Sequence, residues 1–579
     1  MSFFITFYKL LNSKQKINFY LMIVFSIIII FFELLSIGLV IPLISIILDP
    51  DIFLTTFNIE GTKFFPLIEN FINSGFFIYY FLIFFILLFI IKNILVFFIN
   101  YYQLKFVEKI EVSFASSMIY KYLSQKFPFF SKNNSSNLIT KLSIDFLNFT
   151  RGFVQQLITI TSEVLIIFAF ILFIFFLDLH RIGVVFFIFF LVGAISMRII
   201  GKLADKWGEE RKYFDHLKMS LLNNTFFNIK SIIIDNKRNV VVNNFDNYIK
   251  KLASIQKKIM VVKVLPRSIF EIFAIVSLSS LIMFMTVFEY DKNYILTTTG
   301  FFIAVAYRIV PSFQKIIYSY QTISLGKVIL NSIDKDLALS NQISNSNEKL
   351  PFRQNIKINN LHFKYPGRNL FVLNDLQLNI NKGKSIGIFG DSGEGKSTLV
   401  DVISCLIPYD KGEIKVDDVA INNDELIRKW QNQISYVTQN TILFDDTIKN
   451  NIIFSSNSKD IDHSYLEEVI KNTQLSSFID SLPEKVDTNV GEMGAQLSGG
   501  QIKRIGIARA YYKKPELLIF DEATNGLDKE TEEKILSMIF NLKKEMTIII
   551  ISHDINVLKR ADEIFKFSKG KLEKINGNN

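Results

Sequence analysis

The sequence predicts two parts of different fold class: an N-terminal all-α domain with six membrane spans, and a C-terminal α/β domain built around a phosphate-binding loop. Hydrophobic residues make up 50% of the 579 residues, mean hydropathy is +0.31, and hydrophobicity drops after about Asp334. Residues Gly390–Thr398 read GDSGEGKST, the G-x-x-x-x-G-K-[ST] pattern. We expect the membrane domain at residues 1–335, a linker at 336–353 and the second domain at 354–579.

Long apolar runs define the expected spans because a hydrocarbon core about 30 Å thick needs about 20 apolar helical residues. The candidate spans lie near Ile17–Leu48, Phe76–Phe98, Val164–Leu177, Val184–Ile200, Ile269–Phe288 and Thr298–Ile317.

Loop charges predict the orientation of these spans. Lys and Arg are concentrated at Lys105–Lys141 and Lys202–Lys263, so these segments and both termini are expected in the cytoplasm. Such basic loops also account for the net charge of +10 better than nucleic-acid binding does. The sequence shows no cleavable signal peptide. We expect a multi-pass protein of the bacterial inner (cytoplasmic) membrane with its C-terminal domain in the cytoplasm.

Two segments continue well beyond the lipid. Residues 76–127 contain no Gly or Pro, and as one helix they would be about 78 Å long. Residues 202–263 have the same character. Their tips, near Pro128–Asn137 and Asn228–Arg238, are expected to contact a cytoplasmic partner. The outer loop Thr62–Gly75 is expected to form a short amphipathic helix, either on the outer leaflet or folded over the spans.

The phosphate-binding loop lies between an expected strand, Ser385–Phe389, and an expected helix, Thr398–Ile407. Glycines let backbone N–H groups turn toward phosphate oxygens at the helix N-terminus. Lys396 supplies a positive charge for the β- and γ-phosphates, and Ser397 a hydroxyl for Mg²⁺. ATP and Mg²⁺ are therefore the expected cofactors.

From about Ile356 onward the residues resemble the nucleotide-binding domain of ATP-binding cassette (ABC) transporters, whose motifs occur in order. They are the aromatic Tyr365, the Walker A loop, the Q-loop Gln439, VGEMG at Val490–Gly494, the LSGGQ signature at Leu497–Gln501, LLIFDE at Leu517–Glu522, Leu527–Asp528 of the D-loop and the switch histidine His553. The resemblance implies nucleotide contacts from Tyr365, Gly390, Asp391, Ser392, Gly393, Glu394, Gly395, Lys396, Ser397 and Thr398, and from Ser498, Gly499, Gly500 and Gln501.

The chemistry of the strand-end residues agrees with the roles that the family assigns. Asp521 ends an apolar strand where a carboxylate can hold Mg²⁺, together with Ser397 and Gln439. Glu522 can orient and deprotonate the attacking water, and His553 can hydrogen-bond the γ-phosphate. We therefore expect Glu522, His553 and Gln439 to serve catalysis.

Three positions depart from the family pattern. Glu394 stands where a small residue is usual, Asn525-Gly526 replaces Ser-Ala, and Asp554 follows the histidine where Arg is common. The charge of Glu394 is expected to weaken nucleotide binding modestly.

Spans first and cassette second resembles exporter-type half-transporters, which implies a homodimer because each signature completes the partner's Walker A site. FELLSIGLVIPLI (Phe32–Ile44), LPRSIFE (Leu265–Glu271) and AYRIVPSFQKIIYSY (Ala306–Tyr320) further resemble the PglK-type flippases of lipid-linked oligosaccharides. That resemblance implies a cavity in which Lys92, Arg267, Arg308 and Lys315 face a polyprenyl pyrophosphate.

Other readings stay open at this stage. The intramembrane charges could pair with one another, for instance Arg267 with Glu271 at i,i+4. A lipid A-type flippase or a multidrug exporter shares nearly all the motifs. An ATP-gated channel or regulator is the alternative from another class. A nucleic-acid partner is not expected, since the spans argue against a soluble ATPase, and Cys405 as the single cysteine excludes an N-terminal cysteine protease.

Overall fold

The computed structural model describes residues 2–48, 76–176, 180–340, 348–454, 461–524, 528–542 and 545–575. The chain divides into two compact units. One comprises Met1–Leu123 with Asn133–Ser340, and the other comprises Ser124–Lys132 with Asn341–Asn579.

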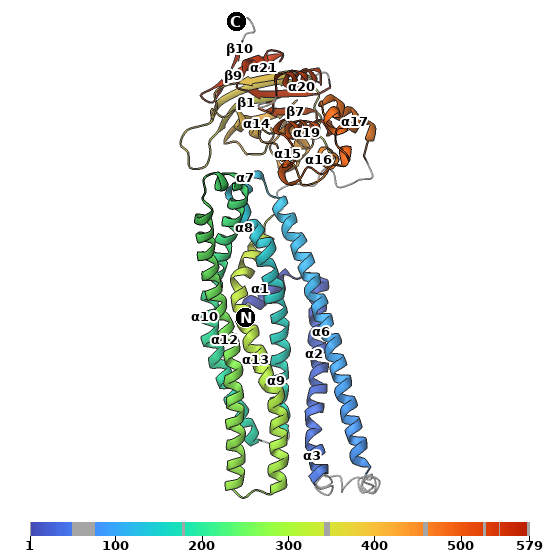
Figure 1. Ribbon diagram of the computed structural model, residues 1–579, viewed down its shortest axis with the longest axis vertical. Coiled ribbons are helices and arrows are strands. Elements are labelled where there is room, and N and C mark those ends of the chain that lie inside the picture. The colour runs from blue at the N-terminus through green and yellow to red at the C-terminus, as the bar shows by residue number, and fades with distance from the viewer. Residues whose placement is uncertain are drawn as a thin grey trace. The chain divides into compact units, whose positions relative to one another are not determined.

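The first unit is helical throughout its described residues (Figure 1). Its elements are α1 (Ser2–Leu10), α2 (Ser13–Gly38), α3 (Val40–Leu48), α6 (Phe77–Leu123), α8 (Ser135–Thr140), the π-helical η2 (Lys141–Asp145) and η3 (Asn148–Val154), α9 (Gln155–Phe176), α10 (His180–Phe227), α11 (Ile229–Ile234), α12 (Arg238–Val287) and α13 (Lys292–Leu337).

Within the described residues, five segments are long and apolar enough to cross a membrane. They are Ser13–Leu48, Phe77–Leu123, Ser135–Phe175, Arg238–Val287 and Lys292–Gly326. The predicted fourth span, Val184–Ile200, lies within α10, where the side chains up to Phe190 are outside the described set. The multi-pass membrane character is therefore confirmed.

The predicted long helices are present. Helices α6, α10 and α12 have 47, 48 and 50 residues, so each is about 70–75 Å long and exceeds a hydrocarbon core. The turn expected near Asn228–Arg238 contains the short helix α11. Helix α9 begins at Gln155, nine residues before the predicted start, because the polar residues ahead of Val164 continue the same helix. The helix expected at Thr62–Gly75 lies outside the described residues.

Burial in this unit fits lipid as the outer solvent. Only 11% of the most apolar window of α6 is buried, so its Phe and Ile side chains face outward. The inner core gathers fully buried side chains of α9, α12 and α13, among them Phe170, Phe270 and Phe301. Helices α10, α12 and α13 pack together, and α2 packs along α6 (Figure 1).

The second unit contains the α/β domain, which we call the cassette (Ile356–Ile575), and the short helix α7 (Phe127–Lys132). Its strands are β1 (Asn355–Phe363), β2 (Leu373–Asn381), β3 (Ser385–Phe389), β4 (Lys411–Val416), β5 (Val419–Ala420), β6 (Ile434–Val437), β7 (Leu517–Asp521), β8 (Thr547–Ser552), β9 (Glu563–Ser568) and β10 (Lys571–Ile575). Its further helices are α14 (Lys396–Ile403), α15 (Asp424–Gln431), α16 (Ile448–Ile453), α17 (His463–Asn472), α18 (Ser476–Asp480), η5 (Lys485–Asp487), η6 (Glu492–Gly494), α19 (Gly499–Tyr512), α20 (Lys529–Asn541) and α21 (Ile555–Leu558).

The strands form two sheets. One is antiparallel in the order β2-β1-β4-β5, and the other has the order β10-β9-β3-β8-β7-β6. In the second sheet, β9, β3, β8, β7 and β6 run parallel, with Phe389 opposite Ser552 and Asp521 opposite Ile551. The near-continuous apolar sequences of β3, β7 and β8 reflect burial on both faces of a parallel sheet.

The helix after the phosphate-binding loop ends four residues earlier than predicted. Helix α14 stops at Ile403, and Cys405 adopts a φ of +53° just beyond it. Cys405 therefore lies past the helix end. Burial raises the pKa of its thiol to about 12, as expected for an unreactive cysteine.

Candidate nucleotide site and transmembrane pocket

Four adjacent parallel strands bring the predicted cassette residues to one edge of the sheet. The Walker A loop follows β3, His553 follows β8, Asp521 ends β7, and Gln439 lies two residues after β6. The carboxyl ends of parallel strands are where open α/β sheets bind ligands. Residues more than 160 positions apart in sequence thus form one candidate site.

The lysine of the Walker A loop bonds to the backbone of the loop itself. Lys396 is 5% exposed, and its Nζ donates to the carbonyls of Gly390 and Asp391, at 2.8 Å each. Gly395 has a φ of +117°, and a Cβ there would lie 2.6 Å from Val372, so this position requires glycine. The resulting loop precedes the N-terminus of α14, the arrangement that binds phosphate.

Glu394 interacts with the loop itself. Its Oε2 accepts a hydrogen bond from the Asp391 N–H at 3.2 Å, and it lies 2.8 Å from where a Cβ on Gly390 would be. A carboxylate therefore occupies one of the backbone donors that the loop offers to an anion. The neighbouring Ser392 and Gly393 are exposed.

A buried acidic group lies beside the loop. The hydroxyl of Tyr436 donates to Asp521 Oδ2 at 3.0 Å. Burial raises the pKa of Asp521, while hydrogen bonds from Ser397 and Tyr436 oppose that shift. Burial likewise raises the pKa of Asp401 to about 6, with repulsion from Asp521 adding to it. A carboxylate and a hydroxyl in contact fit Mg²⁺, which prefers oxygen ligands and retains waters and phosphate oxygens.

No group of three or more His, Cys, Asp or Glu residues that could hold a metal ion by itself occurs among the described residues.

Glu522 is set beside Asp521 by an unusual backbone conformation. Its φ is +50°, which costs a non-glycine residue roughly 1 kcal/mol or more and re-aims the side chain after the strand. Gln439 Nε2 donates to Glu522 Oε2 at 2.7 Å, and His553 Nδ1 lies 4.0 Å from Glu522 Oε1. The three predicted catalytic residues are therefore gathered around one carboxylate.

Tyr365 and the signature occupy separate positions in the cassette. The Tyr365 hydroxyl lies 3.0 Å from Thr398 Oγ1, and its ring packs edge-on against Phe363. Ser498 caps α19, and its backbone N–H donates to Gln501 Oε1 at 2.8 Å. Gly499 has open space around its Cα, and Gly500 follows it in the first turn of α19. This helix N-terminus is a second potential anion site. Asn525–Leu527 of the D-loop lie outside the described residues.

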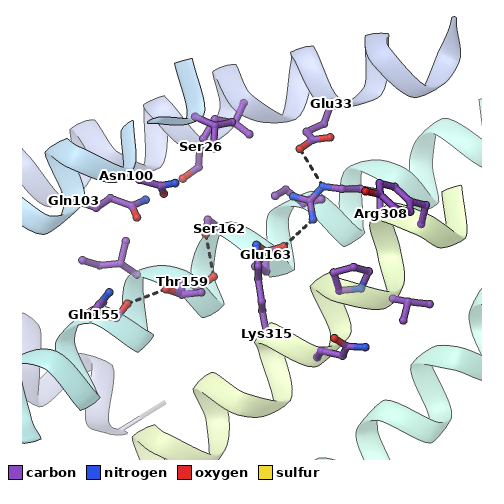
Figure 2. A pocket seen from close by; sticks show the side chains of 18 of the residues that line it. Ser26, Glu33, Asn100, Gln103, Gln155, Thr159, Ser162, Glu163, Arg308 and Lys315 are labelled. Atoms are coloured by element: carbon purple, nitrogen blue, oxygen red, sulfur yellow. Dashed lines mark hydrogen bonds and ion pairs between the residues drawn. The ribbon is translucent and has the colours of Figure 1, made fainter. Parts of the chain in front are cut away.

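The first unit contains a pocket of about 750 Å³ that α2, α6, α9, α12 and α13 line. Its charged residues form a chain of ion pairs, which Figure 2 shows around Glu163. Lys315 Nζ lies 2.7 Å from Glu163 Oε1, Arg308 Nη1 lies 3.4 Å from Glu163 Oε2, and Arg308 Nε lies 3.0 Å from Glu33. Lys92, which is not among the residues that line the pocket, contacts Glu33 at 3.4 Å, and Ser312 donates to Glu163 at 2.7 Å.

Because of these ion pairs, the predicted cations of the cavity are not all free to bind a ligand. Arg308 and Lys92 are 16% and 12% exposed and are held by the chain's own carboxylates. Lys315 and Arg267 are 53% and 67% exposed, although Arg267 pairs with Glu271 at 2.7 Å. Lys92, Arg308 and Lys315 against Glu33 and Glu163 leave a net charge of 3 − 2 = +1. All four predicted cations are therefore in ion pairs, as the alternative interpretation of the intramembrane charges expects.

The buried carboxylates Glu33 and Glu163 were not among the predicted site residues. The spacing of Arg308 and Lys315, one heptad apart, was the available signal that both could reach one acid. Tyr436, Asp401 and Ser312 were missed because Tyr, Asp and Ser outside a motif are too common to single out.

Comparison with known proteins decides the family of the cassette. Residues 373–525 match the family model for ABC transporters. This stretch is an ABC-type ATP-binding domain.

Relatives and a solved structure extend the likeness. A candidate export ATP-binding/permease protein from Rickettsia bellii is 39% identical over 221 residues, 38% of this chain and 37% of that protein. An ATP-dependent lipid A-core flippase from Pseudomonas fluorescens is 35% identical over 252 residues, 43% and 42% of the two chains. The alignments thus span less than half of these relatives.

The structure of a bacterial Atm1-family ABC exporter with ATP bound matches with a TM-score of 0.78 and 18% identity, covering 96% of this chain and 94% of that one. The predicted fold class, a helical transmembrane domain of the ABC exporter type followed by an ABC cassette, is confirmed.

Proposed function

We propose that this protein is an ATP-driven ABC exporter that works as a flippase for an amphipathic, phosphate-bearing lipid. One observation supports this most: a single chain joins an ABC ATP-binding domain to an apolar helical unit with a polar, charge-containing pocket. ATP hydrolysis in the cassette would move the lipid head group from the cytoplasmic to the outer leaflet of the bacterial inner membrane.

In the cassette, we assign nucleotide contacts to Tyr365, to Gly390–Thr398 and to Ser498–Gln501. Lys396 would exchange its two carbonyl contacts for phosphate oxygens. Ser397, Gln439 and Asp521 would hold Mg²⁺, which when bound neutralises charge on the phosphates. Glu522 would accept the proton of the attacking water, positioned by Gln439 and His553.

A second copy of the chain is required in this scheme. The chain contains one Walker A loop and one LSGGQ signature, and in exporters of this fold each nucleotide lies between the loop of one cassette and the signature of the other. The open space around Gly499 is compatible with a nucleotide approaching α19. A monomer with full ATPase activity, measured by light scattering and phosphate release on the same sample, would reject the homodimer.

For the substrate, we propose a polyprenyl-pyrophosphate-linked oligosaccharide. The exposed cations Lys315 and Arg267 can meet a phosphate directly, while Arg308 and Lys92 remain with their acids. The lipid A-core flippases among the relatives favour a lipid A-type head group as the second candidate. Both are anionic lipids, and the pocket chemistry fits either better than an uncharged drug.

The test is ATPase stimulation in proteoliposomes by polyprenyl-pyrophosphate glycans, lipid A precursors, peptides and drugs. We expect the phosphate-bearing lipids to stimulate and the Lys315→Met variant to need more lipid for the same effect. A response to drugs alone would reject the lipid proposal. Current across voltage-clamped bilayers without lipid movement would favour an ATP-gated channel.

A further inference from the structure

The transmembrane pocket has two chemically different ends. Figure 2 shows the ion network of Glu33, Arg308, Glu163 and Lys315 toward one end, and Asn100, Gln103 and Gln155 toward the other. Along α9, Gln155 precedes Glu163 by eight residues, which is about 12 Å of helix. A ligand that contacts both ends must therefore carry two kinds of polar group.

The amide end is formed from two helices. Asn100 and Gln103 are three residues apart on one face of α6, and Gln155 faces them from the start of α9. The hydroxyls of Thr159 and Ser162 also line this part, but they donate to carbonyls of their own helix. The amides are consequently the groups best placed to bind a ligand.

These three amides have no hydrogen-bond partner among the described residues. By contrast, the neighbouring Gln156 accepts from Ser319 at 2.9 Å, and Asn93 on α6 donates to the Phe89 carbonyl at 2.8 Å. An amide offers two donors and an acceptor with two lone pairs, and covering it with an apolar group without a hydrogen bond is costly. An apolar ligand is therefore disfavoured here, and Figure 2 shows the cations Arg308 and Lys315 toward the other end of the pocket.

We propose that Asn100, Gln103 and Gln155 form a subsite for the uncharged, hydroxyl-rich sugar part of the transported lipid. Sugar hydroxyls both donate and accept, so they match the amides group for group. The phosphate of the same head group lies at the ionic end, beside Lys315. This inference rests on the proposed flippase function and adds a sugar-reading element to it. The amide end lies toward the N-terminus of α2 and of α9, which the predicted orientation places on the cytoplasmic side.

The experiment measures the lipid concentration that half-saturates ATPase stimulation in proteoliposomes. It uses polyprenyl pyrophosphate without sugar, the same lipid bearing a disaccharide, and a lipid A precursor. We expect the disaccharide lipid to half-saturate at a concentration about tenfold lower than the bare lipid, as two or three added hydrogen bonds at the weak end of the usual range predict. The double variant Asn100→Ala/Gln103→Ala should reduce this ratio to about two, because only Gln155 of the three amides is left.

The ratio is taken within each variant, so a change in basal turnover does not affect it. Asn93→Ala, on the same helix and bonded to its own backbone, is the matched control and should keep the tenfold ratio. Gln155→Ala, on α9, provides a second variant should the double variant fail to fold, and should also lower the ratio.

Each outcome decides the proposal. Equal half-saturation of the wild type by bare and disaccharide lipids overturns the sugar subsite and leaves the flippase function standing. Retention of the ratio in folded Asn100→Ala/Gln103→Ala or Gln155→Ala protein also overturns it. If only the lipid A precursor stimulates the ATPase and the variants lose this stimulation, the subsite binds the sugar of lipid A. If the variants keep this stimulation, the subsite is rejected. No response to any glycolipid rejects both the cargo and the subsite.

Discussion

In the cassette, the ammonium of Lys396 is held by two backbone carbonyls, whereas in the transmembrane unit Arg308 and Lys315 are held by the carboxylate of Glu163. A cation on neutral acceptors can turn to an incoming phosphate and lose little. A cation that already neutralises a buried acid leaves that acid unpaired when it turns to a phosphate. The nucleotide site is thus preorganised for a highly charged ligand, and the transmembrane pocket for a head group that competes with internal ion pairs.

The largest expected effect tests the cassette half of this comparison. Glu522→Gln should lower ATP turnover between about a hundredfold and ten-thousandfold, because the amide cannot accept the proton of the attacking water. Phosphate release from detergent-solubilised protein measures this. Glu530→Gln is the control, since that carboxylate pairs with Lys534 on an exposed face of α20 and such pairs contribute little. Undiminished turnover in Glu522→Gln would exclude Glu522 as the base.

The next effect tests the transmembrane half. Glu163→Gln removes a carboxylate that is 6% exposed and that contacts Arg308, Lys315 and Ser312. We expect the unfolding free energy of the protein to fall by about 3 kcal/mol, since Arg308 and Lys315 lose the buried acid that they share and Glu33 alone stays beside Arg308. Thermal unfolding in detergent is the measurement.

Glu271→Gln provides the comparison because its pair with Arg267 is largely exposed and should change stability by less than about 1 kcal/mol. Equal effects of the two substitutions would show that burial does not distinguish these ion pairs.

The two regions also differ in how far the sequence predicted them. The cassette motifs predicted the strand ends and the loop because each residue type is required by phosphate or metal chemistry at a set spacing, and the roles of these residues stay predictions. The ion network could not be predicted because Glu33, Glu163 and Arg308 meet across three helices, and one sequence does not determine which faces of α2, α9 and α13 oppose each other. The end of helix α14 was predicted four residues too late because Cys405 gives no signal for its φ of +53°.

A smaller effect tests whether Glu394 competes with the nucleotide for the backbone donors of the Walker A loop. Glu394→Ser removes the carboxylate that accepts the Asp391 N–H and that repels phosphate. We expect ATP to bind about fivefold more tightly, as one hydrogen bond regained by the ligand predicts. Fluorescent-nucleotide titration measures it, and Glu394→Gln, which keeps the acceptor and loses the charge, should lie between the two. Weaker binding in Glu394→Ser would mean that Glu394 supports the loop.

The smallest effect concerns the buried acids behind the nucleotide site. Burial, and then the charge of Asp521, raises the pKa of Asp401 to about 6, against about 3.9 in an unfolded chain. The folded state therefore holds this proton more tightly, and the stability it contributes is complete below about pH 4 and lost as pH rises through about 6. Asp401→Asn mimics the protonated form. Its melting temperature, measured in EDTA to exclude divalent cations, should match the wild type near pH 4 and exceed it by a few degrees above pH 7. A difference in melting temperature between Asp401→Asn and the wild type that stays constant across this pH range would show that Asp401 is ionised throughout. The acids of the cassette would then be balanced by their neighbours, like those of the membrane pocket.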